Sequence, residues 1–337
     1  MGNFDQRYVS IEKETTYGTD PSSAPVFGEI DDESFKHIYE TMVREDMSKY
    51  GASKVVRGKE YCEGSLNTVM MTDPFTATMI AGLFATDTVT TGTPNVHLLE
   101  EGNLTTDFYP TFSIHIGRTA RDHIFTGMSV NKMSVSASVG DFTTMSFECQ
   151  GKSETTSQAT MLSPTFPDNE PCYYANAEIF FNNSATKSAD VKSSDFEISI
   201  NRDLDSGFSI GNLTLTQAPP VTRRSISGTI EFNNPMYAAT AQEPFYDALT
   251  QVGGVGGTTF IYDSGVVGNP ALRMKYIETT NADITFDFFK VVFDSPETSV
   301  SGREHQTMTT PFFALFDNTN DCMVSCTIRS DDASAYI

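Results

Sequence analysis

The residues of this chain that could bind a metal ion or take part in catalysis are few and scattered. His115 and His123 are predicted to lie on flanking strands and could meet across a turn, with Asp122 beside them. A metal site there would need more carboxylates than Asp122 alone. We therefore interpret the histidines as surface or interface residues: His37, His97, His115, His123 and His305.

Acidic clusters at residues 31–33 and 203–205 carry the oxygen ligands that calcium prefers, but neither has the spacing of an EF-hand loop. A solvated acidic loop is the favoured interpretation of both. Cys322 and Cys326 lack a second Cys or His pair, which argues against zinc. We expect no metal ion, no other cofactor and no disulfide framework.

Motifs for nucleotide binding and metal-assisted hydrolysis are missing. The sequence has no G-x-x-x-x-G-K-[ST] loop and no H-E-x-x-H pair. The run GGVGG at 253–257 follows a predicted helix and is interpreted as a flexible turn rather than a phosphate cradle. Because no nucleophile–base pair stands out either, the chain is not expected to be an enzyme.

The charge balance narrows the choice of partners. The 337 residues include 44 acidic and 22 basic side chains, a formal net charge of -22. Such a surface repels nucleic acid and anionic membranes. Three interpretations stay open: general solubility, adaptation to high salt, and a surface that faces DNA without holding it. Two basic islands, 118–121 and 223–224, are either solvated turns or ion-pairing groups at a subunit contact.

No membrane partner is expected from the apolar segments. The N-terminus lacks the apolar core of a signal peptide, and the longest apolar run, 79–85, is far too short to span a bilayer. We therefore expect a soluble protein.

The elements that hold these residues are mainly strands, and the clearest is a hairpin at 126–152 with its turn at Gly140-Asp141. Its alternation gives one apolar face and one small polar face. The predicted apolar face consists of Met133, Val135, Ala137, Val139, Met145, Phe147 and Cys149. The predicted polar face consists of Ser134, Ser136, Ser138, Thr144, Ser146 and Glu148.

Around this hairpin the chain repeats itself. Residues 193–211 match 32–51, with Phe196 on Phe35. Residues 223–232 match 57–66, with Gly228 on Gly64. A strand is expected at 33–46, a loop at 47–58 and a second strand after it. Short helices are expected at 72–84, capped by Thr72 or Asp73, and at 243–254.

The strongest sign of the repeat is a change of face within a strand. The apolar positions switch from even to odd at Asn131-Lys132 and again at Phe289-Lys290. A period-2 pattern changes face only where a residue is added or the strand bends, so both copies predict a bulge or a bend. The resulting prediction is a mainly β protein with an N-terminal extended arm (1–29), two copies of one unit (30–155 and 172–337) and a linker (156–171).

Several stretches together resemble the tail tube proteins of long-tailed double-stranded DNA viruses of bacteria or archaea. The likeness lies in the arm ETTYGTDPSSAP, the unit VVRGKEYCEGSL with its following DPF, and the sheet that begins YPTFSIHIG. It continues in a second domain that opens with FEISINRDLDSG and closes with TTPFFALFDN. The resemblance covers most of the chain, although its motifs are patterns rather than fixed chemistry.

The resemblance implies tandem duplicated β-sandwich or barrel domains, each with one short flanking α-helix. It also implies that subunits form rings, that inner strands join into a barrel around a lumen, and that rings stack into the hollow tube that conducts viral DNA. A duplicated subunit would form a trimeric, pseudo-hexameric ring, with a hexamer as the alternative. Implied partners are other copies, other tail proteins, and a tape-measure protein and DNA that pass without tight binding. The implied location is the virion tail, assembled in the host cytoplasm.

Two sets of residues are assigned on this basis. The hydroxyls and carboxylates expected to line the lumen are Ser134, Ser136, Ser138, Thr144, Ser146, Glu148, Asp283, Thr285 and Asp287. The loop residues expected to stack rings, alongside the N-terminal arm, are Lys49, Tyr50, Lys54, Asp205, Phe208 and Arg223. The alternatives are another ring-forming tail protein, such as a distal tail or terminator protein, and a two-domain β adhesin.

Overall fold

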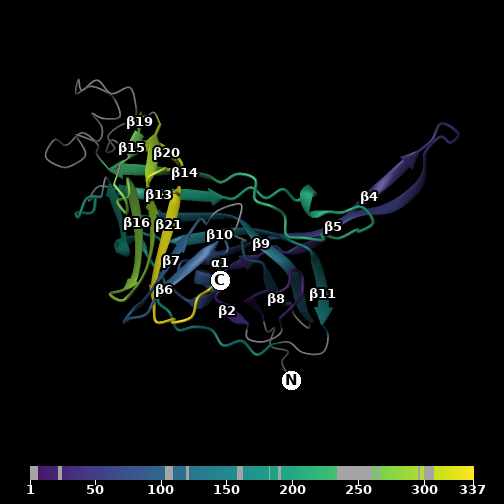
Figure 1. The fold of residues 1–337 in the computed structure, drawn as a ribbon, viewed down its shortest axis with the longest axis horizontal. Coiled ribbons are helices and arrows are strands. Elements are labelled where there is room, and N and C mark those ends of the chain that lie inside the picture. Colours follow the sequence, from purple (N-terminus) through teal and green to yellow (C-terminus); the bar gives the residue numbers. More distant parts are fainter. Residues whose placement is uncertain are drawn as a thin grey trace.

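The protein is described from a computed structural model, in which β-strands dominate. The described residues are 7–21, 25–102, 109–118, 121–157, 162–181, 183–188, 191–233, 261–263, 266–294, 297–299 and 307–337. Figure 1 shows the strands gathered into one body, from which a long hairpin extends to one side.

The first half of the chain contains the only α-helix of the described residues. Its elements are β1 (Tyr8–Lys13), β2 (Val26–Gly28), β3 (Asp32–Glu33), β4 (Lys36–Glu45), β5 (Ala52–Val69), α1 (Pro74–Ala81), β6 (Thr86–Thr90), β7 (Asn95–Glu100), β8 (Phe112–Arg118), β9 (Arg121–Ser138), β10 (Thr144–Gly151) and β11 (Ser153–Ser157). The predicted N-terminal arm thus contains β1, which pairs with β2 and β8.

The described part of the second half is also built mainly of strands. Its elements are the 3-10 helix η1 (Tyr174–Asn176), β12 (Ala177–Phe181), β13 (Val191–Ser199), η2 (Asp205–Gly207), β14 (Ser225–Asn233), β15 (Ile261–Asp263), β16 (Leu272–Thr279), β17 (Ala282–Phe288), β18 (Lys290–Phe293), β19 (Glu297–Ser299), β20 (Thr307–Ala314) and β21 (Val324–Ser330). The helix predicted at 243–254 lies outside the described residues.

One large sheet runs through both halves. Its central order is β5-β10-β9-β13-β14-β20-β18, and β4 extends it beyond β5. The join is the antiparallel pair of β9 and β13, in which Val135 lies opposite Phe196 and Met133 opposite Ile198. The two halves therefore share backbone hydrogen bonds as well as a core.

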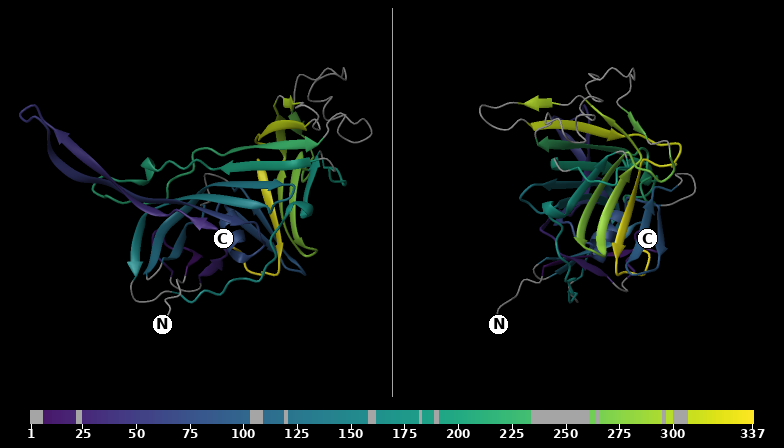
Figure 2. Two further views of the ribbon diagram at one scale, coloured as in Figure 1. Left: turned by 180° about the vertical axis from the view of Figure 1, so that it is seen from behind. Right: turned by 90° about the vertical axis from the view of Figure 1, so that its left-hand side faces the viewer.

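A smaller sheet connects the halves a second time. Its order is β12-β16-β17-β21-β7-β6, so the β6–β7 hairpin of the first half adds to an edge of the second. His97 on β7 is fully buried there, with its two ring nitrogens near Asp87 and the carbonyl of Asp332. The views of Figure 2 show this sheet standing across the end of the large sheet.

The predicted change of face in the first copy is confirmed as a β-bulge. Glu148 of β10 pairs with Lys132 of β9, whereas the next residue, Cys149, pairs with Val130. Asn131 is the added residue. β9 pairs with β8 and β11 before the bulge and with β13 after it, and its pairing with β10 continues on both sides of the bulge.

The second copy has its switch where it was predicted, at Phe289-Lys290. β17 ends at Phe288 within the small sheet, and β18 begins at Lys290 within the large sheet. In the second half a single stretch of chain therefore passes from the small sheet to the large sheet at the switch, which explains why the apolar phase must change there.

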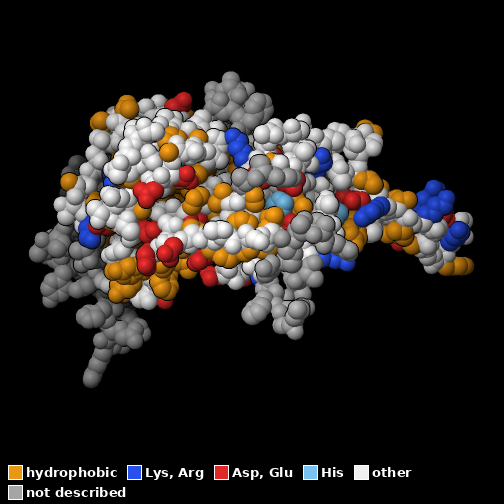
Figure 3. All heavy atoms as spheres, turned by 90° about the horizontal axis from the view of Figure 1, so that it is seen from below, with side chains coloured by type: hydrophobic (Ala, Val, Ile, Leu, Met, Phe, Trp, Pro, Cys, Tyr) orange, Lys and Arg blue, Asp and Glu red, His pale blue; other side chains and the backbone are white. Residues whose placement is uncertain are grey.

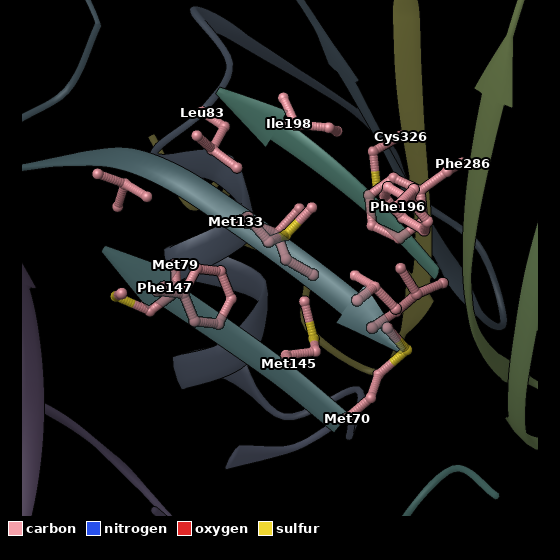
Figure 4. Close-up of a cluster of buried hydrophobic side chains, with 14 of the residues drawn as sticks. Met70, Met79, Leu83, Met133, Met145, Phe147, Phe196, Ile198, Phe286 and Cys326 are labelled. Carbon is pink, nitrogen blue, oxygen red and sulfur yellow. The ribbon is translucent and has the colours of Figure 1, made fainter. Parts of the chain in front are cut away.

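The predicted hairpin is confirmed, and its apolar face forms the core. Figure 4 shows its side chains packed with residues from α1, the segments on either side of α1, β13 and the small sheet: Met133, Met145, Phe147, Met70, Met79, Leu83, Phe196, Ile198, Phe286 and Cys326. Burying one such side chain stabilises a fold by about 1.5–3 kcal/mol. Val139 is a correction: β9 ends at Ser138, so Val139 lies in the turn and is 56% exposed.

Helix α1 begins where the sequence predicted. The Asp73 carboxylate accepts a hydrogen bond from the Thr76 amide at 3.0 Å, and Pro74 occupies the first turn. The helix is almost wholly buried, and it contacts β1 and β2. Among the described residues, no helix combines the length and apolar character needed to cross a lipid bilayer.

The β4–β5 hairpin corrects the predicted loop at 47–58. β5 already begins at Ala52 and pairs with β4 out to Glu45, so only a short turn remains between the strands. Val55 and Val56 favour a strand once β4 offers a partner, even though both are exposed on this extension. Pairing with β4 therefore determines that this segment is a strand, and a local sequence pattern does not reveal that pairing.

Candidate functional site

The six polar residues predicted on the hairpin lie on one face of the large sheet. Register places Ser146 opposite Ser134 and Thr144 opposite Ser136. A shallow groove of about 200 Å³ runs over this area and is lined by Asp31, Asn67, Thr68, Ser134, Ser136, Thr144, Met145 and Ser146. Ser138 and Glu148 continue the same alternation along β9 and β10. We call this surface the polar face.

The polar face continues onto the second half through residues that the sequence prediction missed. Across the β9–β13 join, Ser134 lies opposite Glu197 and Ser136 lies opposite Asp195. β14 adds Ser227 beside Glu197 and Thr229 beside Asp195. The alternation in SSDFEISI and ISGTIEF carries this signal, since its polar positions follow the same period of two.

The lysines around the polar face are neutralised by neighbouring carboxylates. Lys132 Nζ lies 2.9 Å from Glu197 and 3.4 Å from Glu148. The hydrogen bond with Glu197 raises the pKa of Lys132, so the amine stays protonated. Two further lysines have partners of their own: Lys36 with Glu63 at 3.0 Å, and Lys192 with Glu231 at 2.9 Å.

Asp283, Thr285 and Asp287 are not brought together with the serines. They lie on β17, before the switch at Phe289, and therefore belong to the small sheet. All three are buried. Their carboxylates pair within that sheet, Asp287 with Arg273 at 2.6 Å and Asp283 with Arg329. Together with Arg273, Lys275, Thr327 and Arg329, these three residues line a groove of about 190 Å³ on the small sheet.

The six predicted stacking residues all lie at one end of the large sheet. Lys49, Tyr50 and Lys54 are exposed at and near the tip of the β4–β5 hairpin, where Figure 3 shows basic side chains gathered. Asp205 and Phe208 lie at the base of this hairpin. Lys59 Nζ lies 2.6 Å from the Asp205 carboxylate and 5.2 Å from the centre of the Phe208 ring. Arg223 is exposed in the loop before β14.

The two halves differ at this end. The second-half loop between β13 and β14 does not extend as a hairpin but folds back along β5. The amide of Glu60 donates a hydrogen bond to the carbonyl of Leu213 at 2.8 Å, and Glu60 forms a parallel bridge with Thr214. Of these two segments, only the one in the first half forms a protruding hairpin.

The residues considered for chemistry have local structural partners. His115 is buried rather than at the surface, which corrects the prediction; its ring nitrogens contact Asp122 at 2.9 Å and Asp20 at 3.1 Å. Arg118 donates two hydrogen bonds to Glu33 within the same chain. His305 lies outside the described residues.

No metal-binding group emerges from the described part of the chain. There, no three His, Cys, Asp or Glu side chains are grouped as a metal site requires. All five cysteines fall within the described ranges, and each is buried and unpaired.

The sequence also contains a G-x-S-x-G pattern, at residues 207–211. A nucleophile of this type requires a sharp turn between a strand and a helix. Here the segment is an exposed loop, and the Ser209 hydroxyl contacts the Thr216 hydroxyl at 2.9 Å. This segment therefore lacks the strand-to-helix turn of a nucleophile elbow.

The fold defines a class: a mainly β protein in which both halves of the chain share one continuous sheet. Comparison of the sequence with known protein families narrows this class further. The family model of the phage tail tube protein matches residues 5–288, and the chain belongs to this family. It is thus a structural protein of the tail tube. No curated protein sequence matches the chain closely enough to count as a relative.

Proposed function

We propose that this protein forms rings that stack into the hollow tail tube and that the polar face lines the channel through which viral DNA passes. The observation that carries the proposal is the β9–β13 join within the chain. It pairs β9, which lies beside β10 in the first half, with β13, which lies beside β14 in the second half. The same join between chains would continue the large sheet until it closes on itself, which removes its edges.

The repeat gives this closure a definite register. Phe35 corresponds to Phe196 and Lys132 to Lys290 in the two copies. Transferred to β18 and β4 of a neighbouring chain, the register of the intrachain join sets Phe293 opposite Phe35 and Val292 opposite Lys36. Phe35 and Phe293 are both core residues of their own repeats, as are Val135 and Phe196 in the intrachain join. The transferred register thus keeps apolar side chains on the core face.

The outer edges of β4 and β18 determine how the sheet can close. Among the described strands, β4 pairs with β5 alone, which leaves its other edge open. The outer edge of β18 is paired with the three residues of β15. Closure therefore requires the neighbour's β4 to take this edge in place of β15. Three chains then supply six repeats, which makes the ring a pseudo-hexamer.

The polar face suits a channel wall for a polyanion. Hydroxyls and carboxylates are wetted by water, and Lys132 is held between two carboxylates. DNA binds proteins largely through phosphates and basic side chains, so a wall without free cations does not retain it. A tape-measure protein would occupy the same channel without tight binding. We place the assembled tube in the virion tail, formed in the host cytoplasm and joined to other tail proteins.

Cysteine cross-linking tests the ring directly. Lys36→Cys and Val292→Cys in one chain place two thiols opposite each other across the proposed join, and the native cysteines are buried. After mild oxidation, denaturing electrophoresis without reductant should give covalent dimers and trimers, with a closed trimer as the largest species. A ladder that extends to six chains would show a hexameric ring instead.

A matched control uses the join that the chain already has. Ser136→Cys with Asp195→Cys pairs residues that lie opposite each other in β9 and β13, so it should cross-link within one chain without changing the oligomer. If this control oxidises and the Lys36/Val292 pair does not, the proposed ring join is wrong. Electron microscopy of the same material separates a tube protein, which forms long tubes, from a terminator or distal tail ring, which does not polymerise.

A further inference from the structure

We infer that the tip of the β4–β5 hairpin docks on the β9–β10 turn and the adjoining η1 segment of a second copy in the next ring. This rests on the proposed function, because it names the surface that receives each ring-stacking hairpin. The two surfaces lie at opposite ends of one strand, differ in charge, and both expose apolar side chains.

The hairpin tip is apolar and basic. Met47 and Tyr50 are fully exposed, and Met42 and Val43 are more than half exposed. From residue 44 to residue 57 the chain has four basic side chains against two acidic ones, in a protein with twice as many acids as bases. A protruding, exposed apolar surface of this kind marks a protein–protein contact.

The opposite end of the sheet has an exposed aromatic patch. Val139 and Phe142 in the β9–β10 turn are 56% and 55% exposed, and Tyr173 and Tyr174 are 41% and 44% exposed. A backbone bridge between Phe142 and Tyr173 holds the two segments together. We call these four residues the far-end patch.

A small pocket lies beside the far-end patch, at the join of the two halves. Its volume is about 60 Å³, and its lining includes Val139, Tyr174, Val191 and Lys192, whose amine is paired with Glu231 at 2.9 Å. The charge is opposite to that of the hairpin tip. Asp141, Asp168 and Glu170 are exposed in and beside the patch, and the segments 139–144 and 162–176 have no basic residue.

The register shows that the two surfaces face opposite ways along the strands. β5 starts at Ala52 near the hairpin tip and ends at Val69, which pairs with Thr144 next to the β9–β10 turn. Its 18 residues span roughly 60 Å at the usual rise of a strand. Within one copy the tip therefore cannot reach the far-end patch.

A second copy placed further along the strand direction brings the tip and the patch together. Such a head-to-tail contact between unlike surfaces repeats without limit when it does not close, as stacking requires. Basic against acidic surface favours this pairing over tip-to-tip or patch-to-patch contacts. Since the described loop between β13 and β14 does not protrude, these two segments together offer one hairpin tip per chain.

Two complementary variants test the contact. The tip variant, Met47→Ser with Tyr50→Ser, loses the hairpin's apolar contacts and keeps the patch. The patch variant, Phe142→Ser with Tyr174→Ser, does the reverse. Phe166→Ser is the matched control, because Phe166 is also 42% exposed but packs against Phe27 of β2, away from both surfaces. Electron microscopy and light scattering measure ring and tube formation.

Neither the tip variant nor the patch variant should form tubes alone, yet both should form rings, and the control should form tubes like the wild type. Mixed in equal amounts, the two variants should form stacks of two rings and nothing longer. The hairpins of the patch variant then dock on the intact patches of the tip variant. Tubes formed by the patch variant alone, or a mixture that stays as single rings, would overturn the inference.

Charge reversal gives a second readout. Lys49→Glu with Lys54→Glu should reduce tube formation, and adding Asp141→Lys with Glu170→Lys in the same chain should restore it. No restoration counts against the docking surface. If the wild type and all variants fail even to form rings, the proposed function itself fails, and the inference falls with it.

Discussion

Lys132 of β9 lies 2.9 Å from Glu197 of β13, so an ion pair crosses the join between the two halves of the chain. The same amine lies 3.4 Å from Glu148 on β10. One lysine is thus shared between carboxylates on the strands to either side of it. This arrangement keeps the join electrostatically matched and leaves a net negative charge at this point of the polar face.

Replacing both carboxylates by lysine should make the polar face retain DNA. In Glu148→Lys with Glu197→Lys, three cations replace one neutralised lysine, and phosphates gain partners whose binding weakens with salt. We expect slower DNA ejection at low ionic strength and partial recovery at high ionic strength. Real-time DNA release from virions assembled with the variant measures the effect.

The control for this experiment is Glu178→Lys, which changes an acid of β12 in the small sheet. It should leave DNA release unchanged. Equal rates for the wild type, the control and the double variant would show that the acids of the polar face do not act on DNA and contribute to solubility alone.

The two faces of the β9–β10 hairpin should respond very differently to truncation. Phe147 is fully buried in the core, so Phe147→Ala should lower the free energy of unfolding by about 3–5 kcal/mol. Ser146→Ala, on the polar face next to it, should change it by less than about 0.5 kcal/mol. Denaturant unfolding of the unassembled chain measures both, and similar losses would contradict the assignment of the faces.

The sequence predicted those parts of the fold that depend on local alternation. The hairpin turn at Gly140-Asp141, the cap of α1 at Asp73 and both changes of face lie where they were predicted. Each follows from a period or a residue type that a short window contains. The change of face was informative because it reflects a physical event: a β-bulge in the first half, and the passage of the chain between two sheets in the second.

Pairing between distant strands could not be predicted in this way. Asp283 and Asp287 have the right alternation for a polar wall, but their partners Arg329 and Arg273 come from neighbouring strands of the small sheet. Alternation shows that one face of a strand is polar, but it does not show to which sheet the strand belongs. The switch at Phe289 contained the missing information, since residues before it belong to the other sheet.

Two glycines that the predicted repeat aligns should be intolerant of a side chain. Gly64 and Gly228 lie on β5 and β14, and a Cβ on Gly64 would lie 2.6 Å from Phe35, while one on Gly228 would meet Phe312 and the carbonyl of Asp195. Because these contacts involve backbone or buried rings, Gly64→Ala should cost about 1–3 kcal/mol in unfolding free energy.

Gly51 is the matched control, because a Cβ there would meet open space in the turn of the β4–β5 hairpin. Gly51→Ala should leave the unfolding free energy nearly unchanged. A Gly64→Ala protein as stable as Gly51→Ala would show that Phe35 can move aside, and that the repeated glycine reflects something other than close packing.

His115 is buried and contacts Asp20 near the N-terminus, so the free energy of unfolding should depend on pH. Burial lowers the pKa of His115, but the hydrogen bonds and charges of Asp122 and Asp20 outweigh burial and raise it above the ordinary value of 6.5. The protonated ring is thus favoured in the folded state. Its contribution is fully present below about pH 6.5 and is lost as the pH rises through the folded-state pKa.

We therefore expect the stability difference between the wild type and His115→Gln to shrink as the pH rises from 6 to 9. Denaturant unfolding at a series of pH values measures this difference. Asp20→Asn removes one of the two carboxylates that hold the ring, so it should reduce the pH dependence while keeping the histidine. A difference that stays constant, or that grows with pH, would mean that the ring is neutral in the folded protein and that Asp20 and Asp122 hold it without sharing its charge.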